Sequence, residues 1–357
     1  MGGVTLPQPR GEAPGGLTPG APRLADIAAQ AGVSEATVSR VLNGKAGVAA
    51  ATRHRVLAAL DVLGYERPVR LKRRSAGLIG LVIPELTNPI FPAFAQVIEQ
   101  VLAGYGYTPV LCTQMPGGAT EDELVEQLEE RGVTGVVFLS GLHADTSADP
   151  ARYVRLAARG VPFVLINGFN EHIDAHFVSP DDRSAARMAV RHLVDLGHER
   201  IGLAVGPTRY VPSRRKAEGF TAALHALLGV DRDEAETWVR PTLFGVEGGH
   251  AAAGLLLDQG CTGIVCGSDL MALGAIRAVR ARGLDVPGDV SVVGFDDSPL
   301  IAFTDPPLTT VRQPVQAMAT AAVDALLEEI DGNPVQRTEF VFQPELVVRG
   351  STAAPPR

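Results

Sequence analysis

Apolar residues recur at helical spacing between Leu24 and Leu63, in three stretches separated by short polar or glycine-containing segments. This spacing predicts three short helices, within ADIAAQAGV, SEATVSRVLN and ATRHRVLAALDVLGY. Beyond residue 76 the pattern changes, because short β-rich runs such as LIGLVI, GVVFLS and SVVGF alternate with amphipathic helical stretches. Such alternation predicts parallel sheets with crossover helices. The predicted fold class is α/β, with a small all-α head joined to a larger body.

The strand and helix alternation restarts within the body. A first set of strands ends near Asn167, and a second begins near HFVSP and ends about Phe295. Two lobes fit this pattern better than one sheet of ten strands, which would be unusually large. After Pro306 come a strand, a helix and a hairpin-like end, enough to cross between lobes. We expect lobe 1 at about 77–174 plus 303–333 and lobe 2 at about 175–302 plus 334–350.

The other segments have distinct compositions. Residues 1–22 contain five Pro and six Gly with almost no apolar periodicity, so we expect a disordered tail. Residues 23–65 form the predicted helical head, and 66–76 are too basic for a core and are interpreted as a linker. The body then spans 77–350, and a short tail covers 351–357.

Charge divides the chain in the same place. The 357 residues carry a net charge of −8, yet residues 1–75 hold 11 Lys and Arg against 5 Asp and Glu, a net +6 that leaves −14 for the remainder. This split indicates a polyanion-binding module fused to a part that does not touch the polyanion. Three cysteines, Cys112, Cys261 and Cys266, form no CxxC and are expected to be buried reduced thiols. No 18-residue apolar run and no signal peptide are found, so we expect a cytoplasmic protein.

The head has the pattern of a helix-turn-helix. A helix-turn-helix needs a small residue in its first helix, a glycine in the turn and apolar residues that face inward from the second helix. The chain meets these requirements with Ala28, Gly32, Val33, Val38 and Val41. Ser34 is a predicted N-cap of the second helix. An αα-hairpin would share the apolar spacing, but it gives no reason for the outward polar residues beside a run of arginines. DNA binding is therefore the favoured interpretation.

The same segment resembles a known family. LADIAAQAGVSEATVSRVLNGKAGVAAATRHRVLAALDVLGY is similar to the head of the LacI/GalR family of bacterial transcriptional repressors. The resemblance covers about 330 residues and includes IGLVIPELTNPIF, HLVDLGHERIGLAVGP, CGSDLMALGAIRA, DVSVVGFDDS and PPLTTVRQP. It implies a periplasmic-binding-protein-like body, a homodimer on a pseudo-palindromic operator, and repression of carbohydrate-utilisation genes under control of a small effector. The general sequence is also similar to actinobacterial regulators of maltose or other glucoside use.

The resemblance assigns DNA-contacting positions. Glu35, Ala36 and Arg40 match base-reading residues, and their chemistry fits: Arg40 suits guanine, Glu35 suits cytosine N4, and Ala36 suits a thymine methyl. For Glu35, compensation of the helix dipole is an equal alternative. The positions expected on the DNA backbone, which set register, are Ser34, Thr37, Ser39, Asn43, Thr52 and Arg53.

The linker departs from the family pattern. The family hinge reads Y-x-P-N-x-x-A-R-x-L, whereas this chain has YERPVRLKRRS, with Pro68 displaced and no Asn. We expect a shortened hinge that contacts DNA through Arg70, Leu71, Lys72 and Arg73. Leu71 is the single apolar candidate for insertion into the minor groove. The alternative is that the cations only neutralise phosphates.

In the body the resemblance implies an effector site at the carboxyl ends of the strands. The predicted contacts are Asn88, Phe91, Asn167, Arg215, Lys216, Phe244, Ser268, Asp269 and Asp296. Asp296 is the strongest of these, because VVGFDD places a carboxylate just after a buried strand; helix or loop capping is its alternative role. Many relatives have Arg where this chain has Lys216. The planar guanidinium of Arg suits a phosphate or carboxylate better than the single ammonium charge of Lys does, so Lys216 favours a neutral sugar.

Two rival functions are weighed. An exported sugar-binding protein would share the body but needs an export signal and has no use for residues 24–75. A sugar- or nucleotide-processing enzyme needs a catalytic constellation, and GxGxxG after a strand, GxSxG, a P-loop and HExxH are all missing from the sequence. His172 and His176 lack a nearby third ligand and are interpreted as surface residues, and His198 as structural. We expect no enzyme activity, cofactor or metal. Effector identity, its sign and any assembly beyond the dimer stay open.

Overall fold

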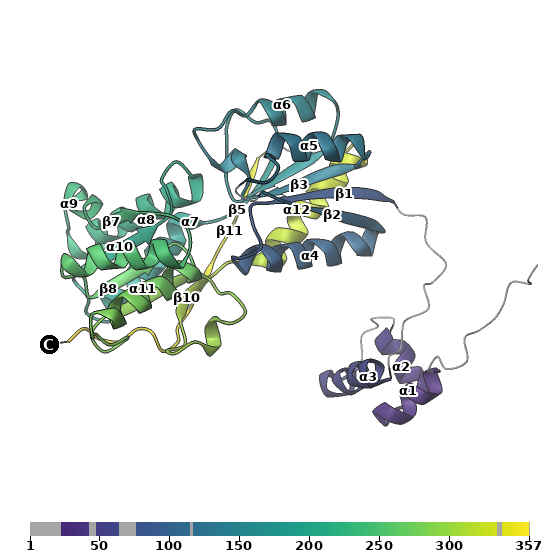
Figure 1. Cartoon of the computed structure of the whole chain (residues 1–357), viewed down its shortest axis with the longest axis horizontal. Coiled ribbons are helices and arrows are strands. Elements are labelled where there is room, and N and C mark those ends of the chain that lie inside the picture. Colours follow the sequence, from purple (N-terminus) through teal and green to yellow (C-terminus); the bar gives the residue numbers. More distant parts are fainter. Residues whose placement is uncertain (1–22, 43–47, 64–75, 115–116, 334–337, 357) are drawn as a thin grey trace, which may run out of the picture. The chain divides into compact units, whose positions relative to one another are not determined.

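The computed structural model describes residues 23–42, 48–63, 76–114, 117–333 and 338–356. The chain divides between residues 73 and 74 into two compact units, a helical head and an α/β body (Figure 1). Among the described residues no helix is long and apolar enough to cross a membrane. The predicted tail at 1–22 and residues 66–75 of the predicted linker at 66–76 lie outside the described residues.

The head consists of the three predicted helices. Its helices are α1 (Leu24–Ala31), α2 (Glu35–Leu42) and α3 (Ala50–Val62). α1 ends at Gly32, whose φ of +64° is in the left-handed region where glycine is favoured, so the predicted turn is confirmed. The buried core of the head consists of Ile27, Ala28, Ala31, Val38, Val41, Val56 and Ala59.

Lobe 1 is built on a sheet of six parallel strands in the order β11-β5-β4-β3-β1-β2. Its strands are β1 (Gly77–Ile83), β2 (Tyr107–Thr113), β3 (Gly135–Leu139), β4 (Phe163–Ile166), β5 (His176–Pro180) and β11 (Glu339–Phe342). Its helices are α4 (Ile90–Tyr105), α5 (Glu121–Glu130), the 3₁₀ turn η1 (Leu142–Ala144), α6 (Ala151–Ala158) and α12 (Val315–Ile330). α4 and α12 contribute to one apolar cluster on the sheet, and α5 and α6 to another.

Lobe 2 repeats this plan with the strand order β12-β10-β9-β8-β6-β7, in which β12 alone is antiparallel to its neighbour. Its strands are β6 (Ile201–Val205), β7 (Val239–Pro241), β8 (Gly263–Cys266), β9 (Ser291–Asp296), β10 (Thr309–Arg312) and β12 (Glu345–Val347). Its helices are α7 (Asp182–Asp195), α8 (Val211–Leu228), α9 (Arg232–Glu236), α10 (Val246–Asp258), α11 (Asp269–Ala281) and the 3₁₀ turn η2 (Ile301–Phe303). α7 and α8 pack on one side of the core, and α10 and α11 on the other. The predicted pair of α/β lobes is confirmed.

The predicted lobe boundaries were wrong in three places. β5 was expected to open lobe 2, but it pairs with β4 and extends the lobe 1 sheet. Residues 303–312 were expected in lobe 1, yet Leu308 packs in a core cluster of lobe 2 and β10 pairs with β9. The expected hairpin at the end does not form, because β11 joins lobe 1 and β12 joins lobe 2. A short apolar run does not specify which strand will become its neighbour, so its pattern could not assign it to a sheet.

Individual side chains also correct two expectations. Cys261 and Cys266 are buried, but Cys112 is only partly so. His172 is exposed as predicted, whereas His176 is buried. The structural role predicted for His198 is confirmed: its ring nitrogens lie 2.9 Å from Thr262 Oγ1 and from Ser291 Oγ. Within the described part of the chain, no group of three or more His, Cys, Asp or Glu is arranged to hold a metal ion.

His143 makes the stability of the body sensitive to pH. Its ring is 1 % exposed, and burial lowers its pKa from 6.5 to about 4. Between these values the unfolded chain binds a proton that the folded chain does not, so stability falls as the pH falls. We expect wild type to lose about 2 kcal/mol more than His143→Gln between pH 7.5 and pH 5.

Urea denaturation of both proteins at the two pH values measures this difference. Other histidines with lowered pKa values, such as His192 and His198, are present in both proteins and cancel in the comparison. Identical losses in the two proteins would contradict the assignment to His143.

Candidate functional site

The outward face of α2 carries the residues predicted to read bases. Glu35, Ala36 and Arg40 are exposed on this helix. The backbone N–H of Thr37 donates to Ser34 Oγ at 3.3 Å, which confirms Ser34 as the N-cap. Side chains of this kind on one short exposed helix are what entry into a major groove requires. The individual base contacts stay predictions.

The backbone-contacting set is only partly described. Ser34 is exposed, and Thr37, Ser39, Thr52 and Arg53 are half-buried in α2 and α3. The remaining members of the predicted DNA-contacting set, Asn43 and the hinge residues Arg70, Leu71, Lys72 and Arg73, lie outside the described residues.

In the body a cavity of about 360 Å³ lies between the two lobes. This volume is within the range of about 300–1,000 Å³ typical of small-molecule sites. Seven of the nine predicted effector contacts line it: Asn88, Phe91, Asn167, Lys216, Phe244, Ser268 and Asp296. The residues that line it follow strands of both sheets, so the predicted position at the carboxyl ends of the strands agrees with the geometry.

Asp296 supplies a buried carboxylate at the end of β9. The residue is 5 % exposed and its φ is +117°, a left-handed value that is costly for a residue other than glycine. Gln313 Nε2 donates to Asp296 Oδ1 at 2.6 Å. Burial raises the pKa of Asp296 well above its ordinary value and the charge of Asp269 adds to this, while hydrogen bonds from Gln313 and Asn88 oppose it. The carboxylate of Asp296 is therefore held in place by hydrogen bonds from Asn88 of lobe 1 and from Gln313, which follows β10.

Lys216 points into the cavity but is not a free cation. Its Nζ lies 2.5 Å from Asp182 Oδ1, and both side chains are at least nine-tenths buried. The same Nζ is 3.8 Å from the centre of the Phe295 ring. Asp182 thus neutralises the positive charge that an anionic ligand would need.

Two amide oxygens remain available at the cavity wall. Asn167 Nδ2 donates to Ser140 Oγ at 3.1 Å, and Gln313 Nε2 is used on Asp296. The opposite atoms of these amides, Asn167 Oδ1 and Gln313 Oε1, find no hydrogen-bond donor among the described residues although both side chains are more than nine-tenths buried. Buried acceptors without a donor are costly, so they point to a ligand that donates hydrogen bonds.

Arg215 was wrongly predicted to contact the effector. It does not line the cavity, because its guanidinium forms a two-pronged ion pair with Glu339 at 2.6 and 2.8 Å. Arg215 belongs to α8 of lobe 2 and Glu339 to β11 of lobe 1, so the pair joins the lobes beside a chain crossing. Neighbouring helical residues point about 100° apart, which is why Lys216 faces the cavity and Arg215 does not.

Asp269 was likewise wrongly predicted to contact the effector. It is fully buried behind the wall and accepts hydrogen bonds from Ser298 N at 2.7 Å and from Thr310 Oγ1 at 2.6 Å. Burial raises its pKa to about 6. Asp269 therefore ties the start of α11 to the segment after β9 and to β10, and acts on the cavity only through neighbours.

Several cavity residues escaped the sequence analysis. The missed polar and aromatic members are Glu85, Gln114, Ser140, Asp182, Tyr210, Phe295 and Gln313. Gln313 stands in the family-like motif PPLTTVRQP directly after β10, and Asp182 lies two residues after β5, so position near the end of a strand was the available signal. Tyr210 follows β6 by a longer loop and gave no such signal.

The cavity and head can be compared with known proteins. Residues 23–67 match the model of the bacterial regulatory proteins of the lacI family, and residues 190–352 match that of a periplasmic binding protein-like domain. The HTH-type transcriptional regulator in the aml 5′ region of Streptomyces limosus is 79% identical over 98% of this chain and 98% of its own length. The HTH-type transcriptional regulator MalR of Streptomyces coelicolor is 68% identical over 94% of this chain and 97% of its own.

Two solved structures share the fold over more than nine-tenths of this chain. A complex of the transcriptional regulator CelR with cellobiose has a TM-score of 0.68 and 33% identity, covering 92% of this chain and 99% of that one. The lac repressor dimer bound to operator and the anti-inducer ONPF has a TM-score of 0.67 and 28% identity, covering 94% and 100%. The resemblance that the sequence motifs indicated is thereby confirmed.

The buried Lys216 pair generates a stability prediction. Lys216→Met leaves Asp182 buried without its partner, and we expect a loss of about 3 kcal/mol in the free energy of unfolding. Arg183→Met, which breaks an exposed pair with Glu218 in the same lobe, is the control and should cost under about 1 kcal/mol. The single tryptophan, Trp238, packs on the lobe 2 core and reports unfolding by fluorescence during urea titration. Equal losses in the two variants would refute a buried charge pair.

Proposed function

Because the chain belongs to the LacI family of bacterial regulatory proteins, we propose that it represses carbohydrate-utilisation genes and that a small sugar in the cavity controls its affinity for operator DNA. The observation that carries the effector half is a pair of buried amide oxygens, on Asn167 and Gln313, that have no hydrogen-bond donor among the described residues and line the same cavity as Asp296. The cavity is then a binding site without catalytic activity, and the protein acts in the cytoplasm, where its DNA is.

The DNA half of the proposal rests on α2. Arg40 donates to guanine O6 and N7, Ala36 packs on a thymine methyl, and Glu35 accepts from cytosine N4 or compensates the helix dipole. All three side chains are exposed. Thr37, Ser39 and Arg53 then hold the phosphates and set the register of the helix in the groove.

The effector half rests on which hydrogen bonds the cavity can make. The buried oxygen atoms of Asn167 and Gln313 require donors, and hydroxyl groups supply them. Phe91, Tyr210 and Phe244 add aromatic surface suited to the apolar face of a sugar ring. Since Asp182 already neutralises Lys216, a neutral sugar fits and a phosphorylated one does not.

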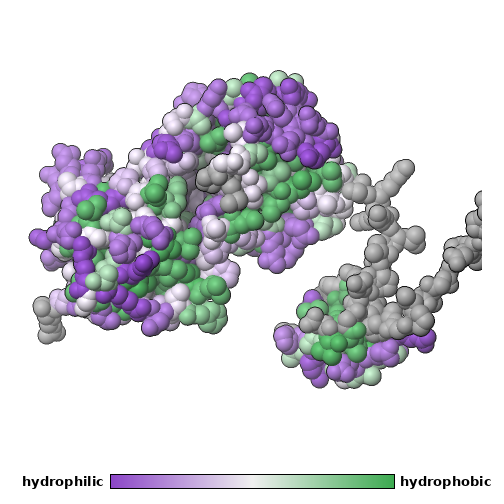
Figure 2. Space-filling model, in the orientation of Figure 1, coloured by the Kyte–Doolittle hydropathy of each residue, from purple (hydrophilic) through white to green (hydrophobic). Residues whose placement is uncertain are grey.

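We propose a homodimer, as in the lac repressor dimer bound to its operator. Apolar residues gather over the η2 segment of lobe 2 (Figure 2), where Leu300 and Phe303 are 72% and 84% exposed. An exposed apolar surface of this kind marks a contact with another protein. Two heads carried by one dimer would read the two half-sites of a pseudo-palindrome.

The operator prediction is tested by selecting binding sites from random duplex DNA with the purified protein at near-physiological salt. We expect a palindrome of about 14–20 base pairs. On the selected site Arg40→Ala should lose about 1–3 kcal/mol of affinity, because a bidentate base contact is removed. Arg232→Ala, an exposed arginine on α9, is the control and should bind as wild type does. Unchanged affinity of Arg40→Ala rejects its base-reading role.

The effector prediction is tested by calorimetry with glucose, ribose, maltose, cellobiose and glucose 6-phosphate. A neutral sugar should bind and change operator affinity, whereas glucose 6-phosphate should not bind. Asn167→Leu and Gln313→Leu should each weaken sugar binding about 10- to 100-fold, the effect of losing a buried hydrogen bond. Gln316→Leu, an exposed site on α12, should leave affinity unchanged. Preferential binding of the phosphorylated sugar would overturn the assignment of a neutral effector.

A further inference from the structure

The two lobes touch at a second place besides the three chain crossings. Residues 141–147 of lobe 1 meet residues 207–210 of lobe 2, and we name this contact the clasp. Asp145 and Tyr210 form an isolated antiparallel β-bridge. Both the backbone N–H and the Oγ1 hydroxyl of Thr146 donate to the carbonyl oxygen of Arg209 at 2.9 Å. The chain does not cross between the lobes at the clasp. The lobes can therefore separate there only if these hydrogen bonds break.

An ion pair strengthens the clasp. Arg209 Nε donates to Asp145 Oδ2 at 2.9 Å, and the Arg209 guanidinium lies 4.9 Å from the centre of the Tyr210 ring. The other carboxylate oxygen of Asp145 accepts from both the backbone N–H and the hydroxyl of Ser147 at 2.9 and 2.6 Å. Although burial acts to raise it, these hydrogen bonds and Arg209 lower the pKa of Asp145. The carboxylate is thus held charged with one oxygen directed at lobe 2.

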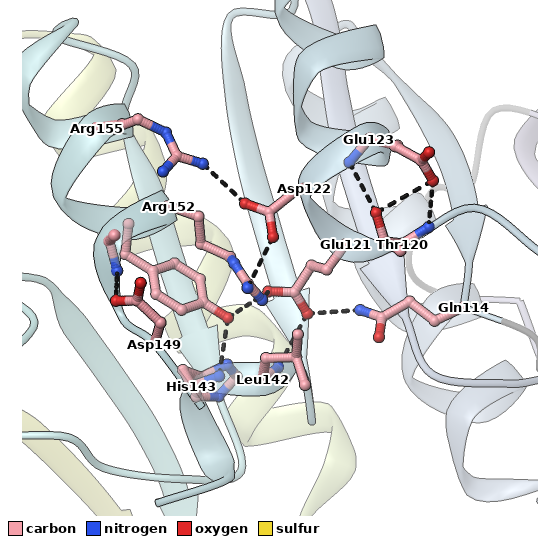
Figure 3. Close-up of polar contacts among 12 residues, drawn as sticks. Gln114, Thr120, Glu121, Asp122, Glu123, Leu142, His143, Asp149, Arg152 and Arg155 are labelled. Atoms are coloured by element: carbon pink, nitrogen blue, oxygen red, sulfur yellow. Dashed lines mark hydrogen bonds and ion pairs between the residues drawn. The ribbon is translucent and has the colours of Figure 1, made fainter. Parts of the chain in front are cut away.

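The lobe 1 side of the clasp is anchored by a buried carboxylate (Figure 3). Glu121, 1 % exposed at the start of α5, accepts from Leu142 N at 2.9 Å and from the hydroxyl of Tyr153. Tyr153 in turn accepts from His143 N at 2.8 Å, and Gln114 Nε2 donates to Glu121 at 2.5 Å. Because the backbone of η1 is bound in this way, the clasp segment cannot follow lobe 2 by local bending. Opening the clasp then requires the lobes themselves to separate.

The clasp also borders the cavity. Leu142, Ala144 and Tyr210 belong to the two segments of the clasp, and all three also line the cavity. The Tyr210 ring packs edge-on against Phe244, another lining residue, with centroids 5.6 Å apart. A molecule in the cavity is therefore enclosed by the same segments whose contacts hold the lobes together.

We propose that the Asp145–Arg209 ion pair is a positioning contact that keeps the lobes closed on the effector and so sets how long the effector stays bound. Neither residue lines the cavity. The inference rests on the proposed function for the identity of the ligand but not for the existence of the clasp. Release of a ligand enclosed between the lobes requires them to open, so losing a contact that exists only in the closed arrangement raises the dissociation rate.

A first experiment needs no ligand. Hydrogen exchange of the sugar-free full-length protein is followed by mass spectrometry on the peptide that contains the Thr146 amide. We expect Arg209→Gln to raise the exchange rate of this amide about three- to tenfold, as expected when one ion pair supporting it is lost. Arg183→Gln, which removes an ion pair with Glu218 inside lobe 2, is the control and should leave the rate unchanged. Two results would overturn the clasp. One is a Thr146 amide that exchanges at the unprotected rate in the wild-type protein, and the other is an equal exchange rate of this amide in Arg209→Gln and Arg183→Gln.

A second experiment measures dissociation of cellobiose, or of the sugar from the panel above that binds in its place, by stopped flow. Asp145→Asn and Arg209→Gln should each raise the dissociation rate about three- to tenfold, and the double variant should raise it no further, because both changes remove one shared contact. Association rates and thermal unfolding should stay near wild type, which a general structural defect would not allow. Unchanged dissociation, or effects that multiply in the double variant, reject the proposal. If no sugar binds, the proposed effector fails while the exchange experiment still decides the clasp.

Discussion

Three crossings of the chain between two sheets place the functional site of the body. The crossings follow Pro180, Arg312 and Phe342, and each leads from a strand of one lobe into an element of the other. Because the strands that carry the site are parallel within each sheet, their carboxyl ends face one space between the lobes. Side chains that follow β1, β4 and β9 therefore meet in one cavity although more than 200 residues separate Asn88 from Asp296.

The positive charges in and beside that space are paired. Lys216 binds Asp182 in the cavity wall, Arg215 binds Glu339 outside it, and the Asp296 carboxylate accepts a hydrogen bond from Gln313. What remains are oxygen acceptors that hydroxyl donors satisfy, so chemical selectivity comes from hydrogen bonding more than from net charge. The acidic balance of the body as a whole does not define the site, and the positive charge needed for DNA is concentrated in residues 1–75.

Buried residues behind the cavity wall fix the position of the backbone segments that line the cavity. Asp269 ties α11 to the segment after β9, and Glu121 fixes η1 and Gln114 from within lobe 1. Neither side chain touches the cavity, yet each holds backbone that does. A regulator that responds to ligand by moving lobes needs such fixed walls, because a flexible wall would absorb the binding energy locally.

Local patterns in the sequence were enough to predict the three helices of the head, the turn at Gly32, the cap at Ser34 and the alternation of strands with helices, because each depends on neighbours within a few residues. The resemblance to the family located seven of the nine predicted effector contacts at the cavity wall. The tertiary structure decided what depends on distant partners: that β5 joins lobe 1, that β11 and β12 separate, and that Arg215 turns to Glu339 while Lys216 faces the cavity. Strand pairing and ion pairing are set by residues far along the chain, and only the folded arrangement brings those residues within bonding distance.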